Sequence, residues 1–273
     1  MKTIKIMGLA ISMFLGLQTA TMRGQEIEVS VLGGLTGGRQ PSIPLSKGST
    51  LGLSALYKQS IHTNFSLGVG LEFGAYQLTK QMSNYNGTTP AVDGQGAAFE
   101  YRYALAKFKE ELRGNYIAIP IQVQYLGPYL GNEKLRLYAA AGIKYQLFTK
   151  VKSTQTLEEI KTSGYYDQWQ AELHNPVYAG FGNLGNKEEE HKLKLNNGFF
   201  VLGELGVKYD LSKEQALYVG LYGDFDLGSK GQESAILTYN EKEQLNSILP
   251  AESNRYKLRM FTLGIKLKYS FGI

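Results

Sequence analysis

The 273-residue sequence contains no cysteine, which excludes disulfide frameworks, thiolate metal sites and cysteine nucleophiles. It has only three histidines, so few side chains are available for acid–base or metal chemistry at neutral pH. It also has only one tryptophan. Beyond the first 24 residues, no apolar run approaches the roughly 20 residues that a membrane helix requires. A disulfide-stabilised domain is therefore excluded, and so is a helical membrane protein beyond the N-terminal segment.

Residues 1–24 have the pattern of a secretory signal peptide. Lys2 and Lys5 form a positive start, and residues 6–17 form an apolar run that is long enough for a signal and short for a bilayer span. Cleavage after Ala20 and cleavage after Gly24 both fit, and an N-terminal membrane anchor is the alternative. We take 1–24 as the signal peptide and 25–273 as one mature domain.

The balance of charge argues against a nucleic-acid partner. The chain has 29 Lys and Arg residues against 24 Asp and Glu residues. Lys2, Lys5 and Arg23 belong to the signal segment, which leaves 26 basic and 24 acidic residues in the rest of the chain. No run of basic residues follows the signal. We therefore expect no nucleic-acid binding.

Glycine and tyrosine are abundant, with 32 and 19 residues respectively, and short segments alternate between apolar and polar positions. Alternation with period 2 is typical of strands that bury one face. Each alternating segment reaches the 9–11 residues with which a tilted strand crosses a bilayer. The predicted strands lie near residues 26–35, 48–59, 64–79, 113–126, 134–151, 197–210, 215–228 and 255–271.

The connections between these strands alternate strictly in length. Those near 60–63, 127–133 and 211–214 are short, whereas those near 36–47, 80–112, 152–196 and 229–254 are longer. Outer-membrane barrels have short periplasmic turns and long external loops. The pattern predicts an all-β fold over 25–273: a transmembrane, antiparallel, up-and-down β-barrel of about eight strands, with both termini in the periplasm.

A closed barrel satisfies every backbone polar group within hydrocarbon, so the apolar face is expected outside and the polar face inside. The inner face carries charges of both signs, which predict a network of ion pairs that fills the lumen; a narrow polar path is the alternative. The predicted lumen charges are Glu28, Glu72, Arg136, Lys144, Glu204, Lys208, Asp224, Asp226, Lys266 and Lys268. The predicted aromatic girdles use Tyr57, Tyr125, Tyr145, Tyr209, Tyr269 and Phe271.

The long connections have patterns of their own. Residues 97–112 fit either a helix or a strand, and the alternation of aromatic residues there favours strands that extend above the membrane. Residues 152–196 contain Tyr165, Tyr166 and Trp169, which we take as candidates for contact with a partner. Residues 241–249 are predicted to form a short helix, and Pro120 indicates a bulge within its strand.

Two segments resemble those of a known family. Residues 115–125, Asn-Tyr-Ile-Ala-Ile-Pro-Ile-Gln-Val-Gln-Tyr, resemble the Tyr-x-x-Ile-Pro strand of the PorT-like outer-membrane β-barrel proteins, which are of OmpA-like barrel type. Residues 264–271 resemble the terminal strand of that family. The resemblance covers nearly all of the mature chain and implies an eight-stranded barrel in the bacterial cell outer membrane, without implying a reaction. One departure is that Phe271 is followed by Gly272 and Ile273, whereas such barrels often end on an aromatic residue that the assembly machinery reads.

From these patterns we predict a non-enzymatic barrel without cofactor, metal or catalytic residues, which binds partners through its long external loops. The expected partners are outer-membrane lipid, the barrel-assembly machinery during biogenesis, and a protein or surface ligand. One alternative is a narrow channel for small solutes. Another is a barrel enzyme that uses His174 or His191 beside Glu188–Glu190, and a third is a soluble secreted barrel.

Overall fold

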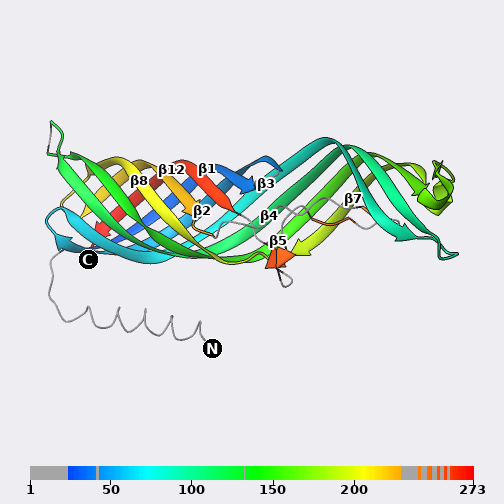
Figure 1. Cartoon of the computed structure of the whole chain (residues 1–273). Helices are drawn as coiled ribbons and strands as arrows, with labels where there is room; N and C mark the ends of the chain where they lie inside the picture. The colour runs from blue at the N-terminus through cyan, green and yellow to red at the C-terminus, as the bar shows by residue number, and fades with distance from the viewer. Residues whose placement is uncertain are drawn as a thin grey trace, which may run out of the picture.

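The computed structural model describes residues 24–40, 43–131, 133–228, 239–240, 245–247, 251–252, 255–256 and 259–273. Eight antiparallel strands form a closed ring, in which β1 pairs with β12 and β4 pairs with β5 (Figure 1). Closure leaves no sheet edge within the ring. The predicted eight-stranded antiparallel barrel is confirmed. Its strands are β1 (Gln25–Gln40), β2 (Ile43–His62), β3 (Phe65–Val92), β4 (Ala98–Tyr129), β5 (Leu135–Tyr166), β8 (Gly198–Asp210), β9 (Gln215–Asp226) and β12 (Met260–Gly272).

The two faces of the ring differ as the alternation predicts. Polar side chains such as Glu28, Lys58 and Glu72 are buried inside. Large apolar side chains cover the outside and are exposed to the surroundings of the isolated chain. We call this outer band the apolar belt; it includes Val29, Val31, Leu51, Leu53, Leu67, Leu71, Phe73, Ile121, Val123, Leu137, Ile143, Val201, Leu205, Leu217, Val219, Leu221, Leu263, Ile265 and Leu267.

The abundance of glycine and tyrosine has a packing explanation. Inside the barrel, the ring of Tyr222 lies over Gly34 and Gly264 of neighbouring strands. A Cβ atom added at Gly264 would lie 2.7 Å from the Tyr222 ring, and one at Gly34 would lie 2.9 Å from the Tyr222 hydroxyl oxygen. Tyr138 covers Gly220 in the same way. Large rings therefore fill the lumen at the positions where glycine leaves room for them.

Three strands continue far beyond the belt. β3, β4 and β5 have 28, 32 and 32 residues, and their upper halves remain paired. β5 pairs with β8 up to Gln146 and, from Val151 onward, with β7 (Gly182–Leu193). We call this part of the molecule the extension: residues 80–112, 151–193, 239–240 and 245–247. It projects from one end of the barrel (Figure 1). The predicted continuation of the third and fourth strands above the belt is confirmed.

Much of what the sequence indicated as loop is therefore strand. β1 reaches Gln40 and β2 begins at Ile43, so most of 36–47 is paired. Residues 152–196 contain the upper part of β5, the 3₁₀ turns η2 (Asp167–Trp169) and η3 (Val177–Ala179), and the strands β6 (Ala171–Leu173) and β7. Two short strands, β10 (Ala251–Glu252) and β11 (Arg255–Tyr256), pair with each other before β12.

The inward-facing side of the long strands changes at three places. Asn84 of β3 and Glu159 of β5 have φ angles of 53° and 52°, which interrupt the extended backbone. A register shift between Asn115 and Tyr116 leaves Thr149 of β5 as an extra residue. In β5 the inward side chains fall on even numbers up to Gln146, on odd numbers from Val151 to Leu157, and on even numbers again from Ile160.

The expected bulge at Pro120 is not present. The register between β3 and β4 is the same on both sides of Pro120, but Ile119 and Pro120 have no ladder partners on β3. Proline has no N–H to donate, so it interrupts the pairing without shifting it. Apart from Gly24 and 245–247, the predicted signal peptide and the predicted helix at 241–249 lie outside the described residues. No helix among the described residues is long and apolar enough to cross a membrane.

Candidate functional site

One centre of the lumen is Lys144 of β5, which joins carboxylates from two other strands. Its Nζ atom donates to Glu72 of β3 at 2.8 Å and to Asp224 of β9 at 2.6 Å. The Tyr116 hydroxyl group of β4 donates to the same Glu72 oxygen at 3.0 Å. The two contacts of Lys144 connect strands that are not neighbours in the ring, so they brace the barrel across its interior.

A second centre lies between β1, β2, β8 and β12. Lys58 lies 2.9 Å from Glu28, and Lys268 lies 3.5 Å from the other Glu28 oxygen. Glu28 is held by these charges rather than by aligned hydrogen bonds. Glu204 accepts from Lys266 at 2.6 Å and also contacts Lys268. Lys268 therefore joins two carboxylates, as Lys144 does in the first centre.

Together the two centres form the lumen network, which consists of four lysines and four carboxylates, each at most 7% exposed. Burial of a charge is tolerated when a partner of opposite sign is close, and each member has such a partner. With all eight groups ionised, the network is neutral. The rings of Tyr138 and Tyr218 lie beside Lys268 and Lys58, at 4.6 and 4.8 Å from ring centre to nitrogen.

Seven of the predicted lumen charges belong to this network, and three lie elsewhere. Arg136 is the second residue of β5 and donates to the carbonyl oxygen of Gly127 at 2.8 Å, near the end of β4. Lys208 pairs with Asp210 at 2.8 Å, near the end of β8. Asp226, at the end of β9, accepts from the Gly228 amide at 2.7 Å. Each of these three residues is close to a strand end, and its partner is at the end of a neighbouring strand, at the end of its own strand or in the following turn.

Lys58 is the member of the network that the sequence prediction missed. Its side chain is 2% exposed, and it pairs with Glu26 at 3.2 Å as well as with Glu28. A signal was present, because Lys58 follows Tyr57 and stands on the inner face of an alternating segment. Tyrosines 116, 138, 218 and 222 also point inward, and each alternates with outward apolar residues along its strand.

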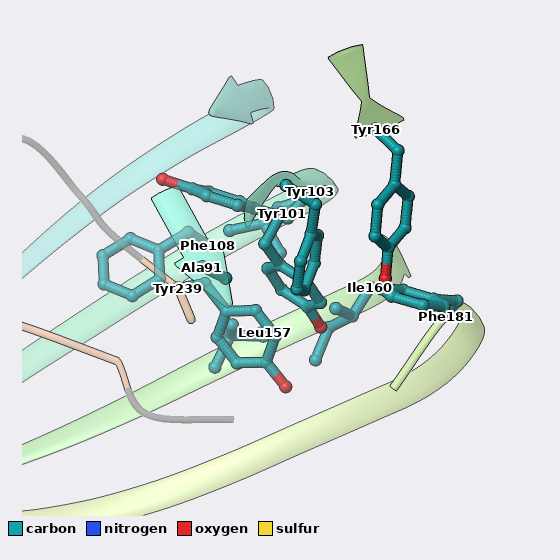
Figure 2. Close-up of a cluster of buried hydrophobic side chains, with 11 residues drawn as sticks. Ala91, Tyr101, Tyr103, Phe108, Leu157, Ile160, Tyr166, Phe181 and Tyr239 are labelled. Atoms are coloured by element: carbon teal, nitrogen blue, oxygen red, sulfur yellow. The ribbon is translucent and has the colours of Figure 1, made fainter. Parts of the chain in front are cut away.

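The extension has a hydrophobic core of its own, outside the barrel (Figure 2). Tyr101, Phe108 and Leu157 are fully buried in it. Tyr239, from the chain between β9 and β12, packs between Tyr101 and Tyr103, and its carbonyl oxygen accepts from Thr89 at 3.1 Å. Burial raises the pKa of Tyr103 to about 12. The core cluster is Ala91, Phe99, Tyr101, Tyr103, Leu105, Phe108, Leu157, Ile160, Tyr166, Phe181 and Tyr239.

Glu110 provides a polar anchor at the base of the extension. Its buried carboxylate accepts from Ser153 at 2.7 Å, from Ser247 at 2.8 Å and from Gln155 at 3.3 Å. Gln155 also donates to the carbonyl oxygen of Asn246 at 3.3 Å. Lys80 stands opposite Glu110 in the ladder, and burial lowers the pKa of Lys80 to about 8 even though Glu110 acts to raise it.

The three predicted contact residues are placed differently at the tip. Tyr166 is only 4% exposed and stacks between Phe99 and Trp169, with ring centres 5.0 and 4.9 Å apart. Tyr166 is therefore a buried residue on which Trp169 packs, and the expectation that it faces a partner does not hold. The ring of Tyr165 is covered by Arg102 at 4.0 Å. Trp169 is 60% exposed.

Other apolar side chains are exposed near Trp169. They lie in or beside β6 and η3, where the Tyr178 side chain is 93% exposed. We call this group the tip residues: Trp169, Leu173, Val177 and Tyr178. Of these, Trp169 is supported from beneath by the extension core, because it stacks on Tyr166.

The two histidines considered for catalysis lie on different parts of the chain. His174 lies between β6 and η3, and His191 of β7 contacts Glu189 at 3.1 Å. In the part of the chain that the structure describes, no group of three or more histidine or carboxylate side chains is placed to hold a metal ion.

The aromatic residues predicted for the girdles lie on the outer face near the two ends of the apolar belt. Tyr57, Tyr125, Tyr209, Tyr269 and Phe271 stand near the short turns. Tyr145 stands at the opposite end and packs against Phe199, with ring centres 4.8 Å apart.

Comparison with known proteins finds similar solved structures. No family model matches the chain, and no curated protein matches its sequence. Surface protein NspA of Neisseria is similar at 10% identity over 91% of this chain and 97% of that chain, with a TM-score of 0.38. The attachment invasion locus protein Ail of Yersinia pestis is similar at 9% identity over 92% and 100%, with a TM-score of 0.32. The N-terminal β-barrel domain of OprF of Pseudomonas aeruginosa is similar at 10% identity over 90% and 97%, with a TM-score of 0.28. These values are low, so the fold rests on the chain's own strand pairing, which is that of an eight-stranded antiparallel β-barrel.

Proposed function

We propose that the chain is a non-enzymatic barrel of the bacterial outer membrane that presents a rigid extension at the cell surface for binding a partner. The apolar belt supports insertion, because side chains such as Leu205 and Leu221 are about two-thirds exposed in the isolated chain. Such a belt is stable when it faces hydrocarbon. The resemblance of residues 115–125 and 264–271 to the PorT-like family supports the same location.

The observation that carries the proposed role is the folded extension. Loops that merely connect strands do not need a core, yet here Tyr101, Phe108 and Leu157 are fully buried above the belt. The upper halves of β3, β4 and β5 stay hydrogen-bonded up to Val92, Ala98 and Tyr165. A rigid scaffold that presents exposed residues at its tip is the usual architecture of a binding surface.

The lumen network supports a closed barrel over the alternative of a channel. An ion path requires groups that exchange partners with the passing ion, whereas Lys144 and Lys268 each hold two carboxylates in a buried, neutral network. Tyrosine rings occupy the space between the charges. An eight-stranded ring is narrow enough for side chains to fill it.

Location and orientation can be tested with single cysteines, because the chain has none of its own. A membrane-impermeant maleimide should label Tyr178→Cys on intact expressing cells, because Tyr178 is 93% exposed at the tip. Ser212→Cys lies in a short turn at the opposite end and should be labelled only after the outer membrane is permeabilised. Equal labelling of both variants on intact cells would overturn the proposed topology.

The binding role needs a second readout. Cells that display the wild-type chain should be retained on protein- or glycan-coated surfaces more strongly than cells that display Trp169→Ser/Tyr178→Ser, since both side chains are exposed at the tip. The matched control is Leu130→Ser, an exposed apolar residue near a turn at the other end. Equal retention of wild-type cells, tip-variant cells and Leu130→Ser cells on every coated surface would contradict a role for the tip. Steady single-channel openings of the folded, inserted protein would instead favour the channel.

A further inference from the structure

A cluster of basic side chains lies on the outer face just above the apolar belt, on β4, β5 and β7. Ile117 and Leu147 face each other as the last outward apolar pair of β4 and β5. Next along these strands come Asn115 opposite Lys150, and then Arg113 opposite Lys152. Lys192 of β7 stands opposite Lys152 on its other side. We call Arg113, Lys150, Lys152, Lys192 and Lys194 the basic cluster; all five are exposed.

Three of these cations form one row across three adjacent strands. Arg113, Lys152 and Lys192 are direct partners in the two ladders, so their Cβ atoms are about 5 Å apart between neighbours. Like charges directly opposite each other destabilise a sheet. A row of this kind is unfavourable in the free chain, and an anion between the side chains would remove the repulsion.

The carboxylates nearby compensate only part of the charge. Glu111 contacts Arg113 at 2.5 Å and is shared with Lys109 at 3.3 Å, and Glu190 contacts Lys152 at 2.5 Å. Among the described residues, Lys150, Lys192 and Lys194 have no ion-pair partner. Five cations therefore face two carboxylates, of which one is shared with a further lysine. The surface retains a local excess of positive charge.

We propose that the basic cluster binds the phosphate headgroup of an anionic lipid in the outer leaflet. The assignment rests on the proposed insertion, which places the end of the apolar belt at the membrane surface. A lipid can occupy the surface beside Ile117 and Leu147 with its chains while its phosphate reaches the row above them. The Arg113 guanidinium group offers paired N–H donors that match phosphate oxygens, and the two lysines supply further donors.

The position of the cluster favours a lipid over a soluble anion. The outward residues at the same level of β3 are Gln77 and Thr79, which carry no charge, and the next strand, β2, places the single exposed cation Lys47 opposite Thr79. The opposite end of the belt carries outward aromatic residues such as Tyr125 and Tyr209. What distinguishes this sector is the row of three cations on adjacent strands β4, β5 and β7, which matches the width of a lipid headgroup.

Native mass spectrometry of the refolded mature chain in detergent tests this site with lipid A, which carries two phosphates, and with the same lipid after dephosphorylation. The variant Arg113→Gln/Lys152→Gln/Lys192→Gln should bind lipid A roughly 100-fold more weakly, since each cation near an anionic lipid contributes about a factor of five to ten in affinity. The matched control, Arg102→Gln/Lys107→Gln/Lys161→Gln, removes the same charge from higher on the extension and should bind like the wild type.

Each outcome decides between the possibilities. Equal weakening in both triple variants, or equal binding of the dephosphorylated lipid by the wild type, would overturn the site. Full competition by millimolar inorganic phosphate would show a soluble-anion site and overturn the lipid assignment. If the cysteine labelling places the chain in the outer membrane but the two triple variants bind lipid A equally, this inference fails alone. If the labelling fails while selective lipid A binding persists, the proposed function fails instead.

Discussion

The Lys144 ammonium group lies 2.8 Å from the Glu72 carboxylate, although the two residues belong to strands separated by β4. Neither strand could hold this contact through its own ladder, because the bond runs across the interior of the ring. The barrel is therefore held together in two ways. Backbone pairing closes its wall, and the lumen network joins opposite parts of that wall from within.

Lys144→Met should strongly destabilise the barrel. It leaves Glu72 and Asp224 buried without their cation, and removal of one partner from a buried ion pair costs about 3–5 kcal/mol. Urea unfolding of the refolded protein measures the change. Lys150→Met is the matched control, because Lys150 stands outward on the same strand and has no ion-pair partner among the described residues. A similar loss of stability in both variants would show that the lumen network is not the cause.

Tyr116→Phe removes a single contact from the same centre. The Tyr116 hydroxyl group donates to Glu72 at 3.0 Å, and a hydrogen bond to a charged group contributes about 1.5–3 kcal/mol. We expect a loss in that range in the free energy of unfolding. Tyr145→Phe serves as the control, since the Tyr145 ring packs outward against Phe199. An unchanged Tyr116→Phe protein would mean that Glu72 is sufficiently satisfied by Lys144 alone.

Gly264→Ala should destabilise the barrel by about 1–3 kcal/mol, because the added methyl group would overlap the Tyr222 ring and the Gly33 backbone. Gly203→Ala is the comparison, since no atom lies within 4 Å of its added Cβ on the outer face. That change should be neutral or slightly stabilising, through lower entropy of the unfolded chain. Urea midpoints of the two variants test the explanation given for the glycine content. Equal midpoints would contradict it.

The extension should become more stable as the pH rises from about 8 to about 10.5. Burial lowers the pKa of Lys80 to about 8 from its usual 10.5, so between these values the unfolded chain binds more protons than the folded chain. Below pH 8 both states are protonated and the full penalty of the buried charge is present. One pKa difference of this size corresponds to a gain of up to about 3 kcal/mol over the whole range.

Fluorescence of Trp169 measures this effect, because the only tryptophan of the chain lies at the tip of the extension. Urea unfolding followed at Trp169 should shift to higher urea between about pH 7.5 and about pH 9.5. Lys80→Met should remove most of the shift and stabilise the extension at neutral pH. Lys107→Met, on the outer face of the same sheet, should keep it. A wild-type midpoint that does not change with pH would refute the assignment to Lys80.

The barrel could be predicted from the sequence because its two faces differ so clearly. Leu53, Ala55 and Tyr57 alternate with inward residues in a period that survives along the whole belt segment of β2. The same alternation of inward and outward residues predicted seven of the charges in the lumen network. It could not give their pairing, because Glu72 and Lys144 are brought together by the curvature of the ring and not by sequence spacing.

The extension was harder to predict for a physical reason. Above the belt both faces meet either water or a small core, so charged residues such as Lys107 alternate with aromatic ones and the apolar signal weakens. The inward side also changes at Asn84 and Glu159, which breaks any fixed period. Tyr166 shows the consequence: near an exposed tryptophan it resembled a contact residue, yet the change of face at Glu159 places it in the core.

The continuity of β3, β4 and β5 from the belt to the tip determines how the molecule carries force. A pull on Trp169 acts almost parallel to strands whose hydrogen bonds lie across the direction of load, so that many ladder bonds resist it together in shear instead of opening one after another. The same three strands form part of the barrel wall. Under the proposed insertion and binding role, a load on the tip would therefore reach the barrel wall before the extension unravels.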